Sequence, residues 1–297
     1  MNNLNYVSIG IPFYNAEATI LDAVRSVLAQ THKNWELILI NDGSTDRSLE
    51  LVQSINDPRV RIYSDGKNRR LAARLNELVG LSKYDFIARM DADDMMTPNR
   101  IEELLKILCD NEKYDLASCG VYSIKDNGSF NGYRGNNESN YTFLGLLEKK
   151  QGFLHAGLVA RKSWFERNRY NELLAVGEDT DLWLRTAKAG DFQAISIKEP
   201  LYFYREEGNV TLEKLLTAYR IERNNYVPLI DNNFTRMKYF HKSVAKTFIV
   251  KIMERTGTLK YLLHRRNKKN EDEQLLQAFN DSLAKIYSTK IPGVDYE

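Results

Sequence analysis

Cysteine is scarce in this sequence of 297 residues, and long apolar segments are absent. The two cysteines, Cys109 and Cys119, are too few for a disulfide framework, and no CxxC pair suggests a structural metal site. Apolar residues never run uninterrupted for about 18 positions, so the sequence predicts no membrane-spanning helix. The first 15 residues have no basic start, and Ser8, Gly10 and Pro12 interrupt their apolar run, which argues against a signal peptide. We therefore expect a cytoplasmic protein.

Several motifs of common enzyme classes are also missing. No GxxxxGK[ST] loop is present to bind a triphosphate, and no GxGxxG follows the first apolar run, which argues against P-loop and dinucleotide-binding enzymes. GxSxG and HExxH are absent and the four histidines are dispersed, so neither a serine hydrolase nor a zinc site is indicated. An EF-hand loop over residues 91–102 fails because Met95 and Met96 replace an oxygen ligand and the turn glycine.

The composition is that of a globular protein with a large core, since 43% of the residues are hydrophobic and 11% are aromatic. The formal net charge of +2 does not mark a nucleic-acid-binding protein, and we expect no nucleic-acid partner. Short apolar runs alternate with segments of helical periodicity, which predicts a parallel sheet covered by helices on both faces. The four runs are residues 6–11, 35–40, 60–63 and 85–90.

Polar residues follow three of these runs, in "PFYNAE" (12–17), "NDGSTD" (41–46) and "DADD" (91–94). Because ligands bind at the carboxyl ends of the strands in such sheets, this pattern favours a nucleotide site there. Asp91 and Asp93, as an extended i, i+2 pair, would point the same way and offer the oxygen ligands that Mg²⁺ or Mn²⁺ prefers. Crowded carboxylates repel one another, so we also expect a positive group nearby. Asp94 could instead cap the helix that begins near Pro98, with no metal involved.

The ordered motifs from "IPFYNAEATILDAVRS" to "ARMDADDMMTPNRI" resemble those of family 2 glycosyltransferases, densely over residues 6–108 and more thinly to 211. The resemblance implies a GT-A fold and an inverting transfer from a nucleotide sugar, most often a UDP-sugar, with Mn²⁺ or Mg²⁺ as cofactor. It also implies a catalytic domain over residues 1–211, with a nucleotide-binding half (1–110) and an acceptor-side half (111–211). A helical, basic region would follow over residues 212–297.

The same resemblance assigns roles to residues of the nucleotide-binding half. Asp42 would face the base of the nucleotide, with Pro12 and Tyr14 lining its pocket; a turn residue before Gly43 is the alternative for Asp42. Asp91 would lie on the ribose side, and Asp93 would bind the metal. Arg70 occupies a position where some members carry an arginine that contacts the nucleotide and many carry glycine; a solvated surface arginine is the alternative.

Further roles fall in the acceptor-side half. In "VGEDTDLWLRTAKAG" (176–190), Asp179 would be the general base beside Glu178 on the substrate side, although both acids could simply stabilise a helix start. Arg205, in "PLYFYREEGNVT" (200–211), would lie near the diphosphate, with a structural ion pair as the alternative. Glu207 stands where histidine is frequent, which leaves its contact with metal open. His155 faces the acceptor or is a core histidine, and the glycine-rich segment 125–140 predicts a hairpin or a mobile loop that closes over the donor.

Between Thr235 and Asn270 basic residues are frequent and Glu254 is the only acid. Interleaved apolar residues give this region a basic amphipathic character, which fits either a helix packed on the main domain or attachment to an anionic membrane surface. A peripheral position on the inner face of the membrane would suit a lipid-linked acceptor in surface polysaccharide or glycan biosynthesis; a saccharide acceptor is equally compatible. Two other functions share parts of this pattern: a nucleotidylyltransferase, whose glycine-rich basic loop is missing here, and a carbohydrate-binding protein, which needs neither Asp93 nor Asp179.

Overall fold

A computed structural model describes residues 6–205, 211–259 and 273–295 of the chain. Its strands are β1 (Val7–Phe13), β2 (Trp35–Asn41), β3 (Val60–Ser64), β4 (Phe86–Arg89), β5 (Met95–Met96), β6 (Leu116–Ile124), β7 (Phe130–Arg134), β8 (Val159–Arg161) and β9 (Ala194–Arg205). Its α-helices are α1 (Ile20–Leu28), α2 (Ser48–Gln53), α3 (Arg70–Leu81), α4 (Arg100–Asp110), α5 (Phe143–Leu147), α6 (Lys162–Arg167), α7 (Glu178–Lys188), α8 (Leu212–Ile221), α9 (Asn233–Arg255) and α10 (Glu273–Ser288). A π-helical turn, η1 (Glu222–Tyr226), and a 3₁₀ turn, η2 (Val227–Leu229), follow α8.

The strands in the described residues form one mixed sheet with the order β3-β2-β1-β4-β8-β6-β9-β5, and β7 pairs with β6. Strands β1 to β4 are parallel, as the sequence predicts, and β6 pairs in parallel with β9. The short strands β5, β7 and β8 run against their neighbours. The chain moves outward from β1 to β3 and then returns to the other side of β1 with β4. The strand order therefore reverses at β1, which is where ligands bind in open α/β sheets.

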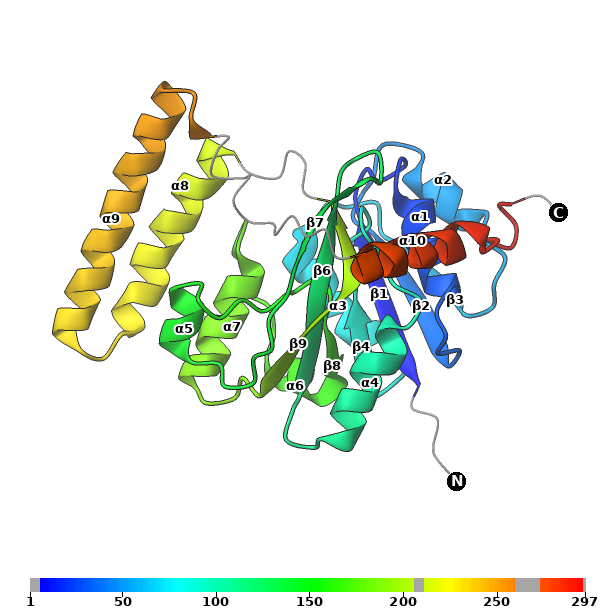
Figure 1. Cartoon of the computed structure of the whole chain (residues 1–297), viewed down its shortest axis with the longest axis horizontal. Helices are drawn as coiled ribbons and strands as arrows, with labels where there is room; N and C mark the ends of the chain where they lie inside the picture. Colours follow the sequence, from blue (N-terminus) through cyan, green and yellow to red (C-terminus); the bar gives the residue numbers. More distant parts are fainter. Residues whose placement is uncertain (1–5, 206–210, 260–272, 296–297) are drawn as a thin grey trace.

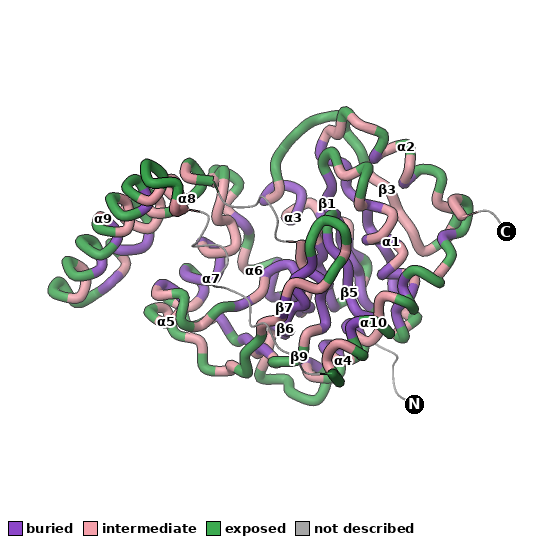
Figure 2. Tube along the Cα trace, turned by 45° about the horizontal axis from the view of Figure 1, so that its top comes forward, coloured by how far each residue is buried: buried purple, intermediate pink, exposed green. Residues whose placement is uncertain are grey.

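Buried side chains line both faces of the sheet, as expected for parallel strands covered by helices. Along β2, Leu37 and Leu39 belong to the core beneath α1 and α4, whereas Ile38 and Ile40 belong to the core beneath α3 and α7. Figure 2 shows the buried residues concentrated around the sheet and the exposed residues on the surrounding helices and turns. The predicted α/β fold with a mostly parallel sheet is confirmed.

The helices after residue 211 occupy two different places. Helices α8 and α9 form an antiparallel pair that projects from the side of the molecule carrying α5 and α7 (Figure 1). Helix α10 lies on the other side, against α1, and buries Phe279 and Ile286 in an aromatic cluster with Tyr122 and Phe203. The end of the chain is held there as well, because Arg25 binds the Asp295 carboxylate at 3.0 Å.

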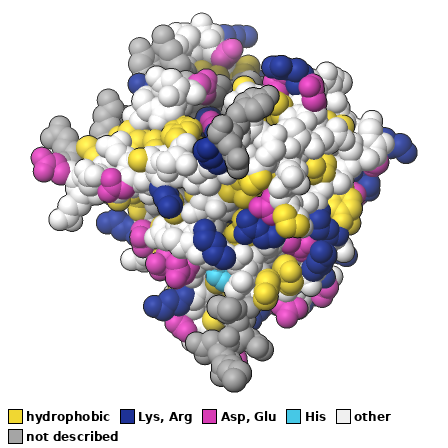
Figure 3. Space-filling view, turned by 90° about the vertical axis from the view of Figure 1, so that its right-hand side faces the viewer, with side chains coloured by type: hydrophobic (Ala, Val, Ile, Leu, Met, Phe, Trp, Pro, Cys, Tyr) yellow, Lys and Arg dark blue, Asp and Glu magenta, His cyan; other side chains and the backbone are white. Residues whose placement is uncertain are grey.

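Charged side chains are mixed on the face that Figure 3 presents, where basic and acidic groups are interspersed. This agrees with the small net charge of the chain. In the described part of the chain, no helix is both long and apolar enough to cross a membrane.

Candidate active site

The carboxyl ends of β1 and β2 meet at the edge where the strand order reverses. The amide of Asp42, directly after β2, donates a 2.8 Å hydrogen bond to the carbonyl oxygen of Phe13 at the end of β1. Pro12 is buried in β1, and Tyr14, just beyond it, is 51% exposed. The structure therefore brings the three predicted base-pocket residues to the same edge of the sheet.

Asp42 is buried and accepts hydrogen bonds from the start of α3. Its carboxylate receives the backbone N–H groups of Arg69 at 2.7 Å and Arg70 at 3.0 Å, and Nε of Arg74 at 2.8 Å. Arg70 adopts φ +69°, in the left-handed region that favours glycine, so a glycine would adopt this backbone conformation without strain. The Arg70 side chain is exposed, so its backbone rather than its guanidinium organises Asp42.

Arg74, which the sequence analysis did not single out, is the main cation behind this pocket. Its side chain is 1% exposed and pairs with Asp42, with Asp65 at 2.5 Å and with Glu77 at 2.7 Å. The guanidinium of Arg74 lowers the pKa of Asp65 to about 2. Arg74 thus ties α3 to the loop after β2 and fixes the orientation of the Asp42 carboxylate.

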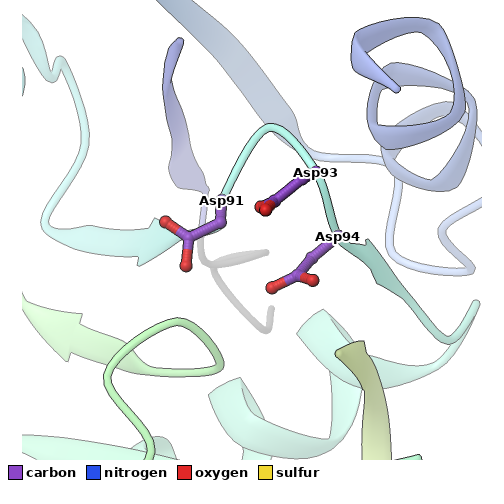
Figure 4. Close-up of side chains that lie close together, drawn as sticks. All are labelled: Asp91, Asp93 and Asp94. Carbon is purple, nitrogen blue, oxygen red and sulfur yellow. The ribbon is translucent and has the colours of Figure 1, made fainter. Parts of the chain in front are cut away.

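The three predicted carboxylates lie together in the turn that joins β4 to β5 (Figure 4). One oxygen from each of Asp91, Asp93 and Asp94 lies within 4.8 Å of the others. The expectation of an extended Asp91–Asp93 pair was wrong, because residues 92 and 93 form a turn in which the amide of Asp94 approaches the carbonyl of Asp91 at 3.4 Å. The turn gathers the oxygens by reversing the chain, so that they converge on a volume suited to a divalent cation.

The positive group that the crowded carboxylates call for is Arg89, the last residue of β4. The side chain of Arg89 is 4% exposed, and its Nη2 atom donates to the Asp91 carboxylate. Burial is the largest single influence on Arg89 and lowers its pKa, but the charge of Asp91, together with smaller contributions from other neighbouring groups, outweighs burial and raises the pKa above its ordinary value. The hydroxyl of Tyr202, on β9, accepts a 3.1 Å hydrogen bond from the Asp91 amide. Asp91 is therefore anchored through both its side chain and its backbone.

Asp93 and Asp94 experience a strongly negative environment. Burial and the charge of Asp91 raise the pKa of Asp93, and burial together with the charges of Asp91 and Asp93 raises the pKa of Asp94 well above its ordinary value. Much of the surface of Asp93 is exposed at the tip of the turn, although its carboxylate lies beside that of Asp91 in a partly enclosed position (Figure 4). Asp94 is 1% exposed. A cation at this turn would relieve the repulsion, and the hard oxygen donors fit Mg²⁺ or Mn²⁺.

The alternative role for Asp94 as a helix cap was wrong. Helix α4 begins at Arg100 after Asn99, and no side chain caps it. Asp94 instead accepts the backbone N–H of Arg205 at 2.8 Å. The Arg205 side chain donates to the carbonyl oxygen of Asp93 and lies 3.5 Å from the Asp22 carboxylate. Arg205 thus contacts the carboxylate turn and forms an ion pair, while Glu207 lies outside the described residues.

The acids of the second cluster lie in the first turn of α7, which begins after Gly177 as the sequence predicts. Asp179 is partly buried, and its carboxylate accepts the backbone N–H of Thr180 at 2.6 Å. Burial and the charge of Asp179 raise the pKa of Glu178, whereas Arg89 lowers it and Asp91 raises it. Glu178 therefore lies within electrostatic range of the end of β4, so the start of α7 faces the carboxylate turn.

His155 is a core residue. It is 7% exposed, and its Nε2 atom lies 2.7 Å from the Tyr170 hydroxyl. Burial, assisted by the charge of Arg89, holds the pKa of His155 well below its ordinary value, so the ring is neutral near pH 7.

The segment 125–140 contains the predicted hairpin, in which β7 pairs with β6.

Arg89 could have been found from the sequence. It ends an otherwise apolar run, where a charged side chain needs a partner, and it precedes Asp91 by two residues. Alternate residues of a strand point to the same face, so the pair was readable from spacing. Arg74 and Tyr202 gave no such signal, because their partners are distant in sequence.

A sheet with clustered acids at its carboxyl edge is the arrangement expected of the glycosyltransferase that the sequence predicts. Residues 8–171, more than half of the chain, match Glycosyl transferase family 2, and the chain belongs to this family. It is similar to the glycosyltransferase EpsE of Bacillus subtilis, with 28% identity over 93% of this chain and 99% of that protein. It is also 28% identical to the chondroitin synthase of Escherichia coli, over 78% of this chain and 33% of that longer protein.

Solved structures show the same fold. Residues 1–349 of TarS from S. aureus, crystallised in complex with UDP-GlcNAc, superpose with a TM-score of 0.61. The match covers 95% of this chain and 81% of that chain, at 16% sequence identity. The chain is therefore a family 2 glycosyltransferase with a GT-A fold.

Proposed function

We propose that this enzyme is a metal-dependent, inverting glycosyltransferase that moves a sugar from a UDP-sugar to a hydroxyl group of a saccharide or lipid-linked acceptor. The observation that supports this most directly is the placement of two acidic groups around one buried arginine. The carboxylates of the β4–β5 turn converge within 4.8 Å, and the charges of both Asp91 and Glu178 act on Arg89. This arrangement supports a single site that combines donor-binding and base-bearing elements.

The carboxylate turn fits a divalent cation. Asp93 is the exposed member and would hold the ion, with Asp91 beside it on the ribose side. When bound, Mg²⁺ or Mn²⁺ supplies positive charge to the diphosphate leaving group. The chain itself positions these oxygens: Arg89 donates to the Asp91 carboxylate, the Asp91 amide donates to the Tyr202 hydroxyl, and the Arg205 backbone donates to the Asp94 carboxylate.

Asp179 is the proposed general base. It lies in the first turn of α7, where the helix dipole stabilises a negative charge, and the amide of Thr180 fixes one of its oxygens. The acceptor hydroxyl would lose its proton to Asp179 as its oxygen attacks the anomeric carbon from the face opposite the departing diphosphate. This displacement inverts the anomeric centre and needs no covalent intermediate with the enzyme.

The nucleotide would bind over the ends of β1 and β2. Asp42, held by the start of α3, would accept a hydrogen bond from the nucleotide's base, and Pro12 and Tyr14 would line the same pocket. UDP is our choice because the structurally similar TarS was crystallised with UDP and with UDP-GlcNAc. Arg205, which contacts the turn through Asp93, would lie near the diphosphate.

Membrane attachment through α9 would suit a lipid-linked acceptor in polysaccharide or glycan biosynthesis. Residues 260–270 of the predicted basic region lie outside the described residues. Large apolar side chains are exposed along α9. These side chains are Phe234, Met237, Phe240, Phe248, Ile249 and Ile252. Exposed basic groups flank them, including Lys238, Lys242, Lys251 and Arg255. This combination favours an anionic bilayer surface.

A screen of nucleotide sugars for Mn²⁺-dependent release of nucleotide tests the proposed function. Asp179→Asn is expected to lower the rate of transfer by about two to four powers of ten, because the amide cannot accept the proton, while nucleotide binding persists. Asp93→Asn is expected to lose both metal-dependent binding of UDP and transfer. Asp110→Asn, an exposed acid at the end of α4, is the matched control and should retain full activity. Full transfer activity in Asp179→Asn would contradict the assignment of Asp179 as the general base.

A further inference from the structure

A cavity of about 230 Å³ lies beside the start of α7, between α5, α8 and η1. Most of its wall is apolar. The lining residues are Leu146, Leu147, Lys149, Val176, Gly177, Thr180, Lys214, Ala218, Tyr219, Ile221, Glu222 and Tyr226. The cavity is larger than the engineered dry cavity of about 150 Å³ that takes up benzene in another protein, so it has room for a sizeable apolar group.

Glu222, the acid in the cavity wall, pairs with Lys246 of α9 at 3.2 Å, and this ion pair compensates its charge. Tyr226 presents a different case: it is 3% exposed, and its hydroxyl makes no hydrogen bond of good geometry to any described residue. Burial and the nearby Asp181 carboxylate raise the pKa of this hydroxyl, which therefore stays protonated and able to donate. A buried hydroxyl without an acceptor is unfavourable, which points to a ligand that supplies one.

The backbone at this wall is also unusual. Helix α8 runs directly into the π-helical turn η1, which contributes Glu222 and Tyr226 to the cavity. Single π-helical turns are rare and occur frequently at functional sites, because the extra residue redirects side chains. Here the turn ends at Tyr226, the residue with the unpaired hydroxyl.

The cavity adjoins the proposed general base. Gly177 and Thr180, which flank Glu178 and Asp179 in sequence, form part of its wall. The Thr180 hydroxyl lies 3.3 Å from the Asp179 carboxylate, so this part of the wall borders the proposed base. Such a position would suit an acceptor subsite.

We propose that this cavity binds an apolar chain carried by the acceptor, such as the first carbons of an alkyl or prenyl group attached to the sugar that receives the transfer. The inference rests on the proposed function, since it takes Asp179 as the base. Burial of the chain would place the acceptor hydroxyl at Asp179, and a polar atom at the head of the chain would accept from Tyr226. The specificity of the enzyme would then depend on the chain as well as on the sugar.

The test uses methyl, butyl and octyl β-glucosides as probes, titrated calorimetrically into the full chain below their micelle concentrations. Each methylene that enters the cavity is expected to strengthen binding about fourfold, from about 0.8 kcal/mol per buried CH₂, until the cavity is full. Ala218 is exposed at the cavity wall, so Ala218→Phe should fill the space without disturbing the core. This variant is expected to lose the gain from the longer chains, about tenfold or more for octyl glucoside.

Arg220→Phe, an exposed position on the same helix outside the lining, is the matched control and should keep the wild-type dependence on chain length. Wild-type protein that binds all three glucosides equally would overturn the inference, even if a variant fails to fold. Unchanged octyl binding in Ala218→Phe would overturn it as well, because the chain would then bind elsewhere, such as on α9. Binding of UDP with Mn²⁺ is measured on the same samples, so failure of the nucleotide site is distinguished from failure of the cavity.

Discussion

Removing Asp91 is expected to destabilise the protein more than removing Arg89, although the two side chains form one ion pair. The asymmetry follows from exposure: the Arg89 side chain is 4% exposed and the Asp91 side chain is 29% exposed. Asp91→Ala leaves a buried guanidinium whose Nε atom already lacks a hydrogen bond to any described residue. Arg89→Met leaves a carboxylate that can regain water from its exposed side, while the methionine fills the volume of the arginine stem.

The magnitudes follow from this difference. Removing one partner of a buried pair costs about 3–5 kcal/mol, and the residual attraction of Arg89 to Glu178 places Asp91→Ala at about 3 kcal/mol. For Arg89→Met we expect about 1–2 kcal/mol, because exposed partners contribute less. The double variant should cost about 2 kcal/mol less than the sum of the single variants, since the interaction is lost only once.

Urea unfolding of metal-free protein at pH 7, followed by circular dichroism, measures these differences. Asp93→Ala serves as the control, because it lies in the same turn and is exposed. Its effect is expected to stay within about 0.5 kcal/mol of wild type or to be stabilising, since it removes a like charge. If Arg89→Met proves as costly as Asp91→Ala, or if the two effects add fully, Arg89 is not the buried counter-charge of this turn.

Three further predictions concern the turn and α9. Asp93→Asn should stabilise metal-free protein at pH 7. The pKa of Asp93 in the folded protein is raised above 3.8, so its carboxyl group favours folding when protonated, below pH 3.8. This contribution is lost as the pH rises through the folded-state pKa, and the neutral asparagine avoids that loss. An equal gain at pH 3 would contradict this. Mn²⁺ at about 100 times its dissociation constant should stabilise wild type by about 2.7 kcal/mol in thermal unfolding, and a similar gain in Asp93→Asn would refute the assigned ligand. Phe248→Glu with Ile252→Glu should abolish sedimentation with anionic liposomes, whereas Leu173→Glu, at an exposed leucine outside α9, should not.

The first four strands could be predicted because each is a short apolar run that the sheet buries. The run at residues 35–40, for example, corresponds to β2, where every residue is buried. Strands β5 and β8 have only two and three residues, too few for a periodic pattern. Their antiparallel pairings depend on contacts between distant parts of the chain, which spacing along the sequence does not reveal.

The candidate site was predictable in its acids but, apart from Arg89, not in its cations. Carboxylates at strand ends stand out because they follow apolar runs, as Asp42 and Asp91 do. Arg74 and Arg100 belong to helical segments in which basic residues ordinarily face water. Yet Arg100 is fully buried and donates to the carbonyl oxygens of Arg89 and Leu158, both at 3.0 Å. Only tertiary structure places such a side chain inside the protein.

The β4–β5 turn is built to be unfavourable when it holds no cation. Among the described residues, Arg89 forms an ion pair with Asp91, whereas burial and neighbouring carboxylates raise the pKa of Asp93 and that of Asp94. The hydrogen bond from the Asp91 amide to the Tyr202 hydroxyl and the one from the Arg205 backbone to Asp94 nevertheless hold the turn in place. Because rigid partners keep the oxygens together against their repulsion, a cation that enters gains attraction without having to order the loop. Affinity for the ion and local instability in its absence therefore have the same physical origin.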